Sequence, residues 1–180
     1  MINRKIARRY AKALMNIGQE DGKYDTYWEE LDAFTALFRQ EEQLSAVLSN
    51  PTFNVTQRQA IITELGKRLR LSPITINLLH LLVDKNRMRY LPDITALYRE
   101  LVDEAAGRAR ATLVTARDLS KKKLEELTQG LQGLVGKQVI VEVQTDPSLI
   151  GGVVTRIGGM VYDGSIKTQL ARLQETLAKG

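Results

Sequence analysis

Apolar side chains recur every three or four positions between residues 3 and about 107, which is the spacing of amphipathic helices. The pattern predicts six helices, at about residues 4–18, 24–38, 44–48, 56–65, 73–83 and 91–105. Ser72 before Pro73 predicts the start of the fifth helix, because serine caps helices and proline fits the first helical position. Thr56 has capping-box spacing to Gln59 at the start of the fourth. Six helices with short connections predict a compact bundle.

After this segment the apolar period changes to two, which predicts strands at about residues 109–114, 139–144, 153–157 and 160–162. Ser120 opens a helix between the first two strands, and Gly158-Gly159 predicts a tight hairpin between the last two. A final helix follows Ser165, and we expect its apolar face to be buried; that face consists of Ile166, Leu170, Leu173 and Leu177. The fold class is therefore mainly α, with a six-helix bundle at residues 1–107 and a small α+β domain at residues 108–180.

Composition narrows the possible chemistry. The 180 residues are 43% apolar and 26% charged, which is ordinary for a globular protein with its own core. The absence of cysteine excludes disulfides, thiolate metal sites and a cysteine nucleophile. His80 is the only histidine, and we interpret it as an ordinary residue on the polar side of the fifth helix. No apolar run reaches the length of about 18 residues that would cross a bilayer. We therefore expect no metal, no cofactor and no membrane insertion.

Two helices have surfaces that suggest a partner. In the first, the basic residues cover an arc of roughly 140°, opposite an apolar side with a flank of small residues; these basic residues are Arg4, Lys5, Arg8, Arg9 and Lys12. The basic arc is either a solvated face or part of a binding surface. In the fifth helix, apolar residues cover roughly 220°, about twice what one core requires. That helix is either central and buried on most sides, or keeps a stripe open for a partner's amphipathic helix.

The glycines near the C-terminus do not form a phosphate-binding motif. Neither the P-loop spacing nor the dinucleotide-binding spacing occurs among residues 151–164. We interpret these glycines as positions that require a positive φ or a close backbone approach. Asp146 and Ser148 are spaced for an Asx turn, and Asp163 is placed to favour the start of the last helix. Neighbouring glutamates such as Glu125 and Glu126 point in different directions on a helix, so they form no acid–base pair. Nothing here supports an enzyme.

Three segments near the C-terminus carry a family resemblance: Asp146-Pro147-Ser148-Leu149-Ile150-Gly151-Gly152, Arg156-Ile157-Gly158 and Val161-Tyr162-Asp163-Gly164-Ser165. They closely resemble the C-terminal signature of ATP synthase delta subunits, whose mitochondrial relative is the oligomycin sensitivity conferral protein. Residues 7–14 resemble the opening helix of that family, and Asn86-Arg87 followed by Leu91-Pro92 matches its mid-chain segment. The resemblance covers nearly the whole chain.

The resemblance implies a non-catalytic stator subunit of a rotary ATP synthase, peripheral to the cytoplasmic face of a bacterial cell membrane. It implies that the N-terminal domain receives the N-terminal helix of an alpha subunit between its first and fifth helices. The residues expected to bind that helix are Ala7, Tyr10, Ala11, Leu14, Ile74, Leu78, Leu79 and Leu82. The C-terminal domain would bind the end of the b subunit. Its signature positions are Asp146, Leu149, Ile150, Gly151, Gly152, Arg156, Gly158, Asp163, Gly164 and Ser165.

Two other functions compete with this one. The net charge of +5 and the basic arc of the first helix suggest a nucleic-acid-binding protein, whose affinity would fall steeply with salt. A small enzyme that uses the glycine-rich segment to bind an anionic ligand is the second competitor, and the scarcity of catalytic residue types weighs against it.

Overall fold

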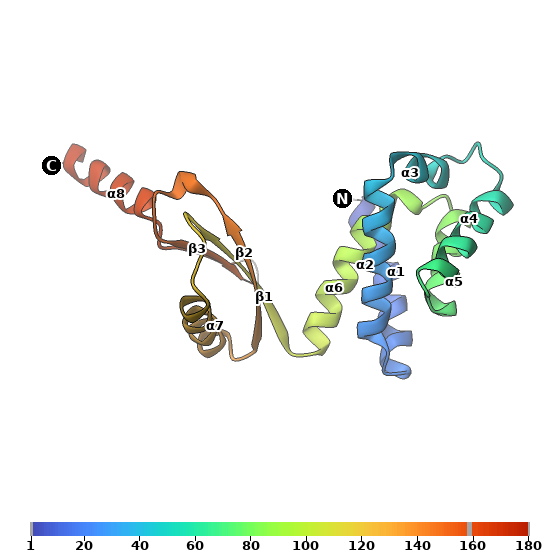
Figure 1. Ribbon diagram of the computed structural model, residues 1–180, viewed down its shortest axis with the longest axis horizontal. Coiled ribbons are helices and arrows are strands. Elements are labelled where there is room, and N and C mark those ends of the chain that lie inside the picture. The colour runs from blue at the N-terminus through green and yellow to red at the C-terminus, as the bar shows by residue number, and fades with distance from the viewer. Residues whose placement is uncertain (1, 158–159, 180) are drawn as a thin grey trace. The chain divides into compact units, whose positions relative to one another are not determined.

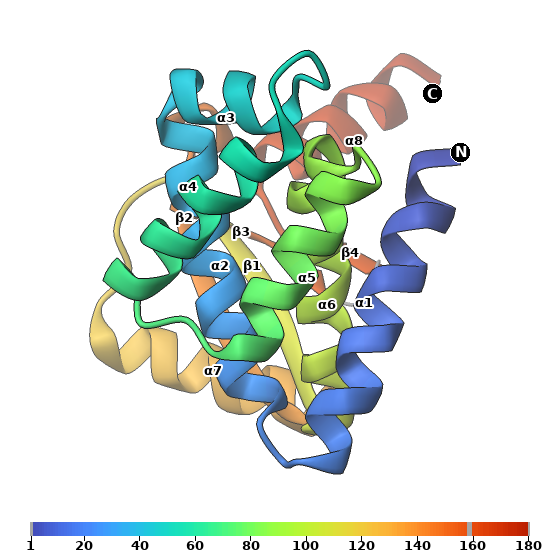
Figure 2. The same cartoon turned by 90° about the vertical axis from the view of Figure 1, so that its right-hand side faces the viewer.

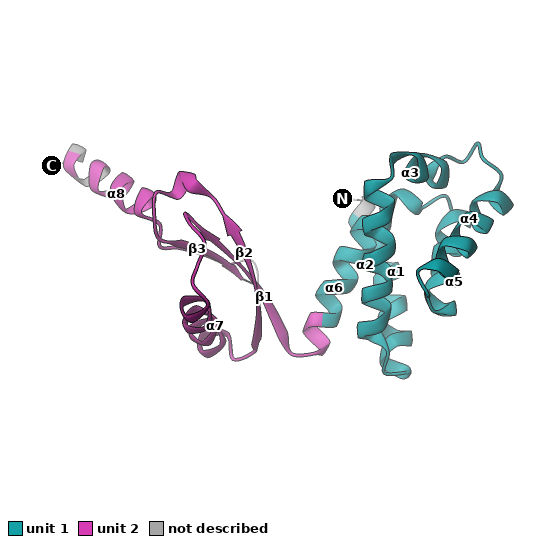
Figure 3. Ribbon diagram, in the orientation of Figure 1, with its two compact units in different colours: residues 1–102 teal, residues 103–180 magenta. Residues whose placement is uncertain are grey.

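The computed structural model describes residues 2–157 and 160–179, and it is mainly helical with one four-stranded sheet. The chain forms two compact units, Met1–Val102 and Asp103–Gly180 (Figure 3). The sequence places the boundary at 107/108, whereas the units divide a few residues earlier, inside helix α6 (Leu91–Ala105). Asp103, near the end of α6, accepts a hydrogen bond from Arg110 Nη2 at 3.3 Å, and both residues belong to the second unit.

The first unit is built from helices that follow one another closely in sequence (Figure 1). They are α1 (Ile2–Glu20), α2 (Tyr24–Gln40), α3 (Glu42–Ser49), α4 (Val55–Arg68), α5 (Pro73–Asp84), the short 3-10 helix η1 (Met88–Tyr90) and most of α6. Figure 2 shows α4 and α5 side by side, with α1 on the other side of α5. The predicted positions of these helices agree with the observed ones, apart from a few residues at their ends.

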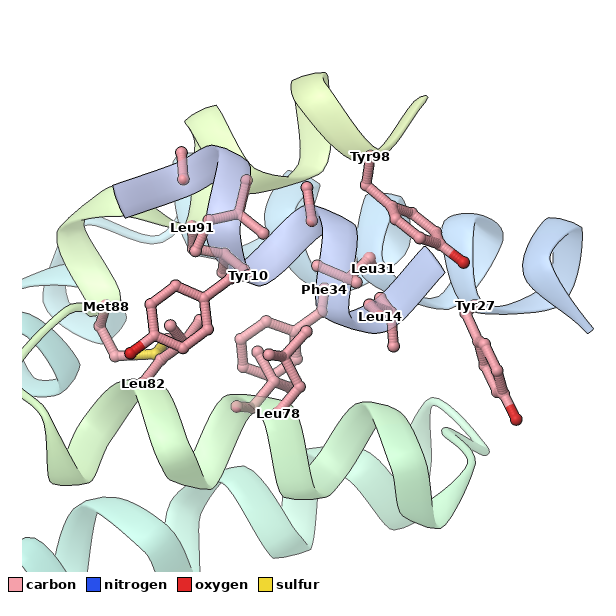
Figure 4. Packing of buried hydrophobic residues seen from close by; sticks show 14 of the residues in the cluster. Tyr10, Leu14, Tyr27, Leu31, Phe34, Leu78, Leu82, Met88, Leu91 and Tyr98 are labelled. Carbon is pink, nitrogen blue, oxygen red and sulfur yellow. The ribbon is translucent and has the colours of Figure 1, made fainter. Parts of the chain in front are cut away.

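The core of this unit lies between α1, α2, α5 and α6 (Figure 4). Phe34 of α2, Leu82 of α5 and Tyr98 of α6 are fully buried there. Gly18 lets α1 end close to the start of α2, because a β-carbon at this position would lie 2.8 Å from the Tyr24 Cα atom. In the first unit, the helical period of the sequence therefore correctly indicates which face of these helices is buried.

Capping residues explain where α4 and α5 begin. Ser72 caps α5 as predicted: its Oγ accepts a hydrogen bond from the Thr75 amide at 3.4 Å, and Pro73 occupies the first turn. The capping-box prediction for Thr56 is wrong. Asn54 is the N-cap of α4, since its Oδ1 accepts from the Thr56 amide at 2.9 Å and places Thr56 already inside the helix. Asn54, two residues before Thr56, therefore occupies the N-cap position in its place.

The second unit contains a sheet with strand order β2-β1-β3-β4. Its elements are β1 (Arg108–Thr115), α7 (Lys121–Val135), β2 (Gln138–Thr145), the 3-10 helix η2 (Pro147–Leu149), β3 (Val153–Ile157), β4 (Met160–Asp163) and α8 (Ile166–Lys179). β1 and β2 are parallel and joined by α7, whereas β3 is antiparallel to both β1 and β4. Gly158 and Gly159, the predicted hairpin turn, lie outside the described residues.

A small apolar core holds α7 against the sheet. Leu113 of β1, Leu131 of α7 and Ile157 of β3 are buried in it. The last helix differs from the expectation: the predicted inward face of α8 is exposed, with Leu173 at 59% and Leu177 at 81%. The amphipathic pattern of α8 is present, but much of its apolar face remains exposed within the described part of the second unit. The period of the sequence identifies an apolar face without telling what packs on it.

Candidate partner-binding surfaces

The binding residues predicted on α1 lie in the core of the first unit. Ala7 and Ala11 are fully buried, and Tyr10 and Leu14 are nearly so. Figure 4 shows Tyr10 and Leu14 on the side of α1 that faces α5. Their apolar surface is therefore already used to pack α1 against its own unit.

The same holds for most of the predicted residues on α5. Leu78, Leu79 and Leu82 are buried, and only Ile74 is half-exposed. Figure 4 shows Leu78 and Leu82 pointing from α5 toward Phe34 and α1. Seven of the eight predicted residues therefore support the α1–α5 arrangement from inside, and Ile74 alone combines apolar character with substantial exposure.

Exposed apolar side chains flank these buried residues on both helices. Ile17 of α1 is 40% exposed and Leu81 of α5 is 42% exposed. On a helical wheel, Ile17 falls within about 40° of Ala13, and Leu81 falls within about 20° of Ile74. We name these four residues, Ala13, Ile17, Ile74 and Leu81, the α1–α5 strip. The sequence predictions omitted most of them, although the helical wheel places them at the outer edge of each apolar face.

At one end of the strip two arginines approach the ring of Tyr10. Arg87 Nη1 donates a hydrogen bond to the Tyr10 hydroxyl at 2.7 Å. The Arg87 guanidinium carbon lies 5.6 Å from the centre of the Tyr10 ring, and that of Arg9 lies 5.9 Å from it. Both distances fall within the range of cation–π attraction. In the part of the chain that the structure describes, neither arginine forms an ion pair with a carboxylate.

A buried arginine holds the turn that carries Arg87. The side chain of Arg58 is 1% exposed and donates to the Leu48 carbonyl at 3.4 Å and to Asn86 Oδ1 at 3.2 Å. Asn86 has a positive φ of 52°, a conformation that asparagine tolerates better than most residues. The Arg87 amide then donates to the Leu82 carbonyl at 2.7 Å. Arg87 is therefore fixed to the end of α5 by its backbone and to α1 by its side chain.

His80 links two helices and is half-buried, as a boundary residue. Its Nε2 atom lies 3.1 Å from Thr63 Oγ1, and that hydroxyl donates to the Gln59 carbonyl at 3.0 Å. Within the described residues there is no group of three or more acidic, histidine or cysteine side chains that could hold a metal ion, and no helix there is long and apolar enough to cross a membrane.

The acidic residues of the C-terminal signature stabilise turns. Asp146 Oδ1 accepts from the Ser148 amide at 2.9 Å, which is the predicted Asx turn, and this hydrogen bond lowers the pKa of Asp146. Asp163 accepts from the Ser165 amide at 2.9 Å and from Thr168 Oγ1 at 2.8 Å. The Ser165 hydroxyl in turn accepts from the Thr168 amide at 3.2 Å at the start of α8. These side chains organise backbone and leave no free acid–base pair.

The signature glycines allow two backbone segments to cross closely. Gly152 has a φ of 83°, and a β-carbon on it would lie 2.3 Å from the Gly164 carbonyl oxygen. The Ile166 amide donates to the Gly151 carbonyl, and the Gly164 amide donates to the Val153 carbonyl, each at 3.0 Å. The two halves of the signature therefore meet backbone to backbone, as the interpretation of these glycines as close-approach positions requires.

The remaining signature positions have different surroundings. Leu149 is half-buried, whereas Arg156 is exposed on β3. Ile150 is 66% exposed and has a φ of 65°, which is unusual for a β-branched residue. It borders an open pocket of about 910 Å³ between the β1–α7 loop and the glycine turn. Gly158 lies outside the described residues.

Apolar side chains are exposed along β4 and α8 of the second unit. They are Met160, Val161, Tyr162, Ile166, Leu170, Leu173 and Leu177. An exposed apolar face such as that of α8 is a candidate interaction surface. Each unit therefore has its own candidate partner-binding surface.

Comparison with known proteins defines the class of this fold. The family model described as ATP synthase delta (OSCP) subunit matches residues 6–177. ATP synthase subunit delta of Desulfatibacillum aliphaticivorans is 47% identical over 179 residues, which cover 99% of this chain and 98% of that protein. The same subunit of Geobacter sp. (strain M21) is 45% identical over 180 residues and the full length of both chains. The chain belongs to the ATP synthase delta (OSCP) subunit family.

A solved structure supports the fold independently. A chain of the mitochondrial ATP synthase hexamer of Toxoplasma gondii superimposes with a TM-score of 0.72, covering 96% of this chain and 97% of that one at 24% sequence identity. The similarity extends over both units, so the helical unit and the sheet unit occur together in that chain as well. The family resemblance inferred from the sequence is confirmed.

Proposed function

We propose that this chain is a stator subunit of an F-type ATP synthase, which links the catalytic head to the peripheral stalk so that rotor torque drives ATP synthesis. The observation that carries this role is the match of the family model over residues 6–177, together with relatives that align over their whole length. The subunit is structural and performs no catalysis itself. It acts at the cytoplasmic face of the cell membrane, as a peripheral part of the complex.

The N-terminal domain that the sequence predicts at residues 1–107, a six-helix bundle that includes the first unit, binds the N-terminal helix of the alpha subunit. The α1–α5 strip is the surface that supports this assignment. Complete burial of a leucine or isoleucine side chain contributes about 1.5–3 kcal/mol. Ile17 and Leu81 still expose about two-fifths of their surface, so each has roughly 1 kcal/mol left to contribute. An amphipathic helix laid along the strip would recover that energy, as helix-in-groove partners do.

The C-terminal domain that the sequence predicts at residues 108–180, which lies within the second unit, binds the C-terminal end of the b subunit. The exposed apolar side chains of β4 and α8 support this assignment, because an amphipathic helix such as α8 is completed by a second apolar surface. The signature residues contribute mainly by shaping the turn that starts α8. The nucleic-acid-binding alternative has no counterpart among the relatives.

Binding of a peptide with the sequence of the N-terminal helix of the cognate alpha subunit tests the first assignment. The informative variant is Leu81→Glu, because the side chain is exposed and the substitution does not disturb the core. We expect its dissociation constant to rise at least tenfold, since a charge would replace an apolar contact. Leu134→Glu is the matched control: Leu134 is an exposed leucine on α7 of the other unit, 72% accessible.

Fluorescence anisotropy of a labelled peptide measures both affinities, and circular dichroism verifies that both variants are folded. Equal affinity of the wild type, Leu81→Glu and Leu134→Glu would show that the strip is not the binding surface. Failure of the wild type to bind the peptide at all would refute the proposed role of the first unit.

A further inference from the structure

We infer that the Tyr10 end of the α1–α5 strip is a carboxylate-binding site, which selects a partner helix with an acidic residue at one end and so fixes its direction along the strip. The site consists of Arg9, Tyr10 and Arg87. This inference rests on the proposed function of the first unit and adds the charge and the orientation of the bound helix.

The first argument is the supply of hydrogen-bond donors. A guanidinium carries five N–H donors, and the described side-chain hydrogen bond of Arg87 uses a single one, to the Tyr10 hydroxyl. Arg9 approaches the same ring and is exposed. Two guanidinium groups within 6 Å of one ring centre create a local positive charge that no described carboxylate neutralises by an ion pair. A partner carboxylate would be the missing counter-charge, in a charge-assisted hydrogen bond.

The second argument is that Arg87 is already positioned. Its amide is bonded to the end of α5, the preceding Asn86 is held by the buried Arg58, and its side chain is bonded to Tyr10. A side chain that is ordered before binding loses little conformational entropy when the partner arrives. A surface lysine or arginine without these contacts would lose more. The geometry thus favours Arg87, together with Arg9 beside the same ring, over the cations of α1 that have no described contact with Tyr10.

The third argument is the difference between the two ends of the strip. Tyr10 lies in the first half of α1 and contacts Arg87, which follows the C-terminus of α5, so the two helices run in opposite directions (Figure 2). Glu20 ends α1, about 15 Å further along at 1.5 Å per residue. The strip therefore has arginines at one end and an acidic residue at the other. A bound helix with its carboxylate at the Tyr10 end is attracted, and the reversed helix meets Glu20 instead.

The occupant is a protein helix rather than a nucleic acid. The residues between the two ends, such as Ile17 and Leu81, are apolar and would face the partner along its length. A phosphate backbone requires charge at every step, and this surface offers it at one end only. One carboxylate beside a row of apolar side chains is the complementary pattern, and an amphipathic helix has it.

The test compares the wild type with two single-residue variants and uses three peptides. Arg9→Glu is compared with Arg8→Glu, which makes the same charge change at the adjacent, exposed position but about 100° around the helix. The peptides are the cognate alpha N-terminal helix and two copies of it, in which the acidic residues of either the first or the second half are replaced by amides. Anisotropy at low and at moderate salt gives the dissociation constants.

We expect Arg9→Glu to weaken binding of the unmodified peptide at least tenfold and to flatten the salt dependence, whereas Arg8→Glu changes affinity less than threefold. One of the two amide peptides should lose affinity for the wild type and be insensitive to Arg9→Glu; the other should behave as the unmodified peptide. Equal affinities for all proteins and peptides would overturn the inference while the proposed function stands. If the wild type binds none of the peptides, the proposed function itself fails.

Discussion

Replacement of Gly152 by alanine tests how the C-terminal signature stabilises the second unit. The change adds one methyl group at a position with a φ of 83°, where an alanine side chain is strained. The added carbon would lie 2.3 Å from the Gly164 carbonyl oxygen and 2.9 Å from the Ser165 Cα atom. Both are backbone atoms of the turn that starts α8, so relief requires the two crossing segments to separate.

The structure sets the size of the effect. The left-handed conformation costs an L-residue about 1–2 kcal/mol, and forcing an extra carbon into a tight contact adds about 1–3 kcal/mol. The sum is about 2–5 kcal/mol. A unit of 78 residues (103 to 180) has a stability of about 4–12 kcal/mol. Gly152→Ala should therefore remove a large part of the free energy of unfolding of the second unit, and unfold it entirely if the stability is at the low end.

The two units can be followed separately in one urea titration. Trp28, the only tryptophan, reports on the first unit by fluorescence, whereas amide NMR signals of the strands report on the second. Gly133→Ala is the matched control: Gly133 lies in α7, and a β-carbon there meets no atom within 4 Å. It should stabilise the same unit by up to about 1 kcal/mol, because alanine favours helices over glycine.

Opposite signs for the two glycine variants, with an unchanged Trp28 transition, are the expected outcome. A Gly152→Ala protein whose second unit unfolds at the wild-type urea concentration would refute the close crossing of the signature segments. A shift of the Trp28 transition would show instead that the substitution acts beyond the unit in which it lies.

Two further predictions concern the first unit. The Tyr27 hydroxyl donates a hydrogen bond to Asp21, which lowers the pKa of Asp21 below 3.8 and raises the pKa of Tyr27 to about 12. The stabilising contribution of this hydrogen bond is therefore complete between pH 3.8 and 10. It is lost as the pH falls through the lowered pKa of Asp21, and also as the pH rises toward the raised pKa of Tyr27, about 12. The difference in stability between the wild type and Asp21→Asn, measured by urea titration, should therefore shrink at both extremes of pH. The Glu30 carboxylate accepts hydrogen bonds from the Ser72 amide at 3.0 Å and from the Ser72 hydroxyl at 2.7 Å. Glu30→Ala should lower the free energy of unfolding of the first unit, followed by Trp28 fluorescence, by about 1–3 kcal/mol, and Glu30→Gln should lower it less. Equal stability of the wild type and both variants would contradict this role of Glu30.

The sequence predicts the elements well because their periods are local. The residues on each helix that face the core, such as Phe34 and Leu82, follow from a spacing of three to four. The glycines near Gly152 could be assigned to a positive φ or a close backbone approach because the spacings of phosphate-binding motifs are absent. The period of apolar residues does not indicate which other element packs against an apolar face. Leu78 and Leu81 are both leucines within the same apolar arc, and only packing makes one buried and the other exposed.

The arginine-flanked end of the strip depends on contacts that no local pattern indicates. Arg87 and Tyr10 are separated by 77 positions, and Arg58 and Asn86 by 28. Their meeting depends on how η1 returns the chain to α1, which is decided by the packing of the whole unit. The basic arc of the first helix indicates where positive charge gathers, but it does not distinguish Arg9, which approaches the Tyr10 ring, from Arg8, which lies about 100° around the helix.

The central place of β1 in its sheet has a consequence for biosynthesis. β1 leaves the ribosome before β2 and β3, yet both of its hydrogen-bonding edges are completed only by them. The helical unit precedes it in the chain and contains its own core, so it is able to fold while translation of the sheet continues. During that interval β1 is a nascent strand with two open edges, and its exposure to chaperones or to aggregation ends when residues up to about 157 have emerged.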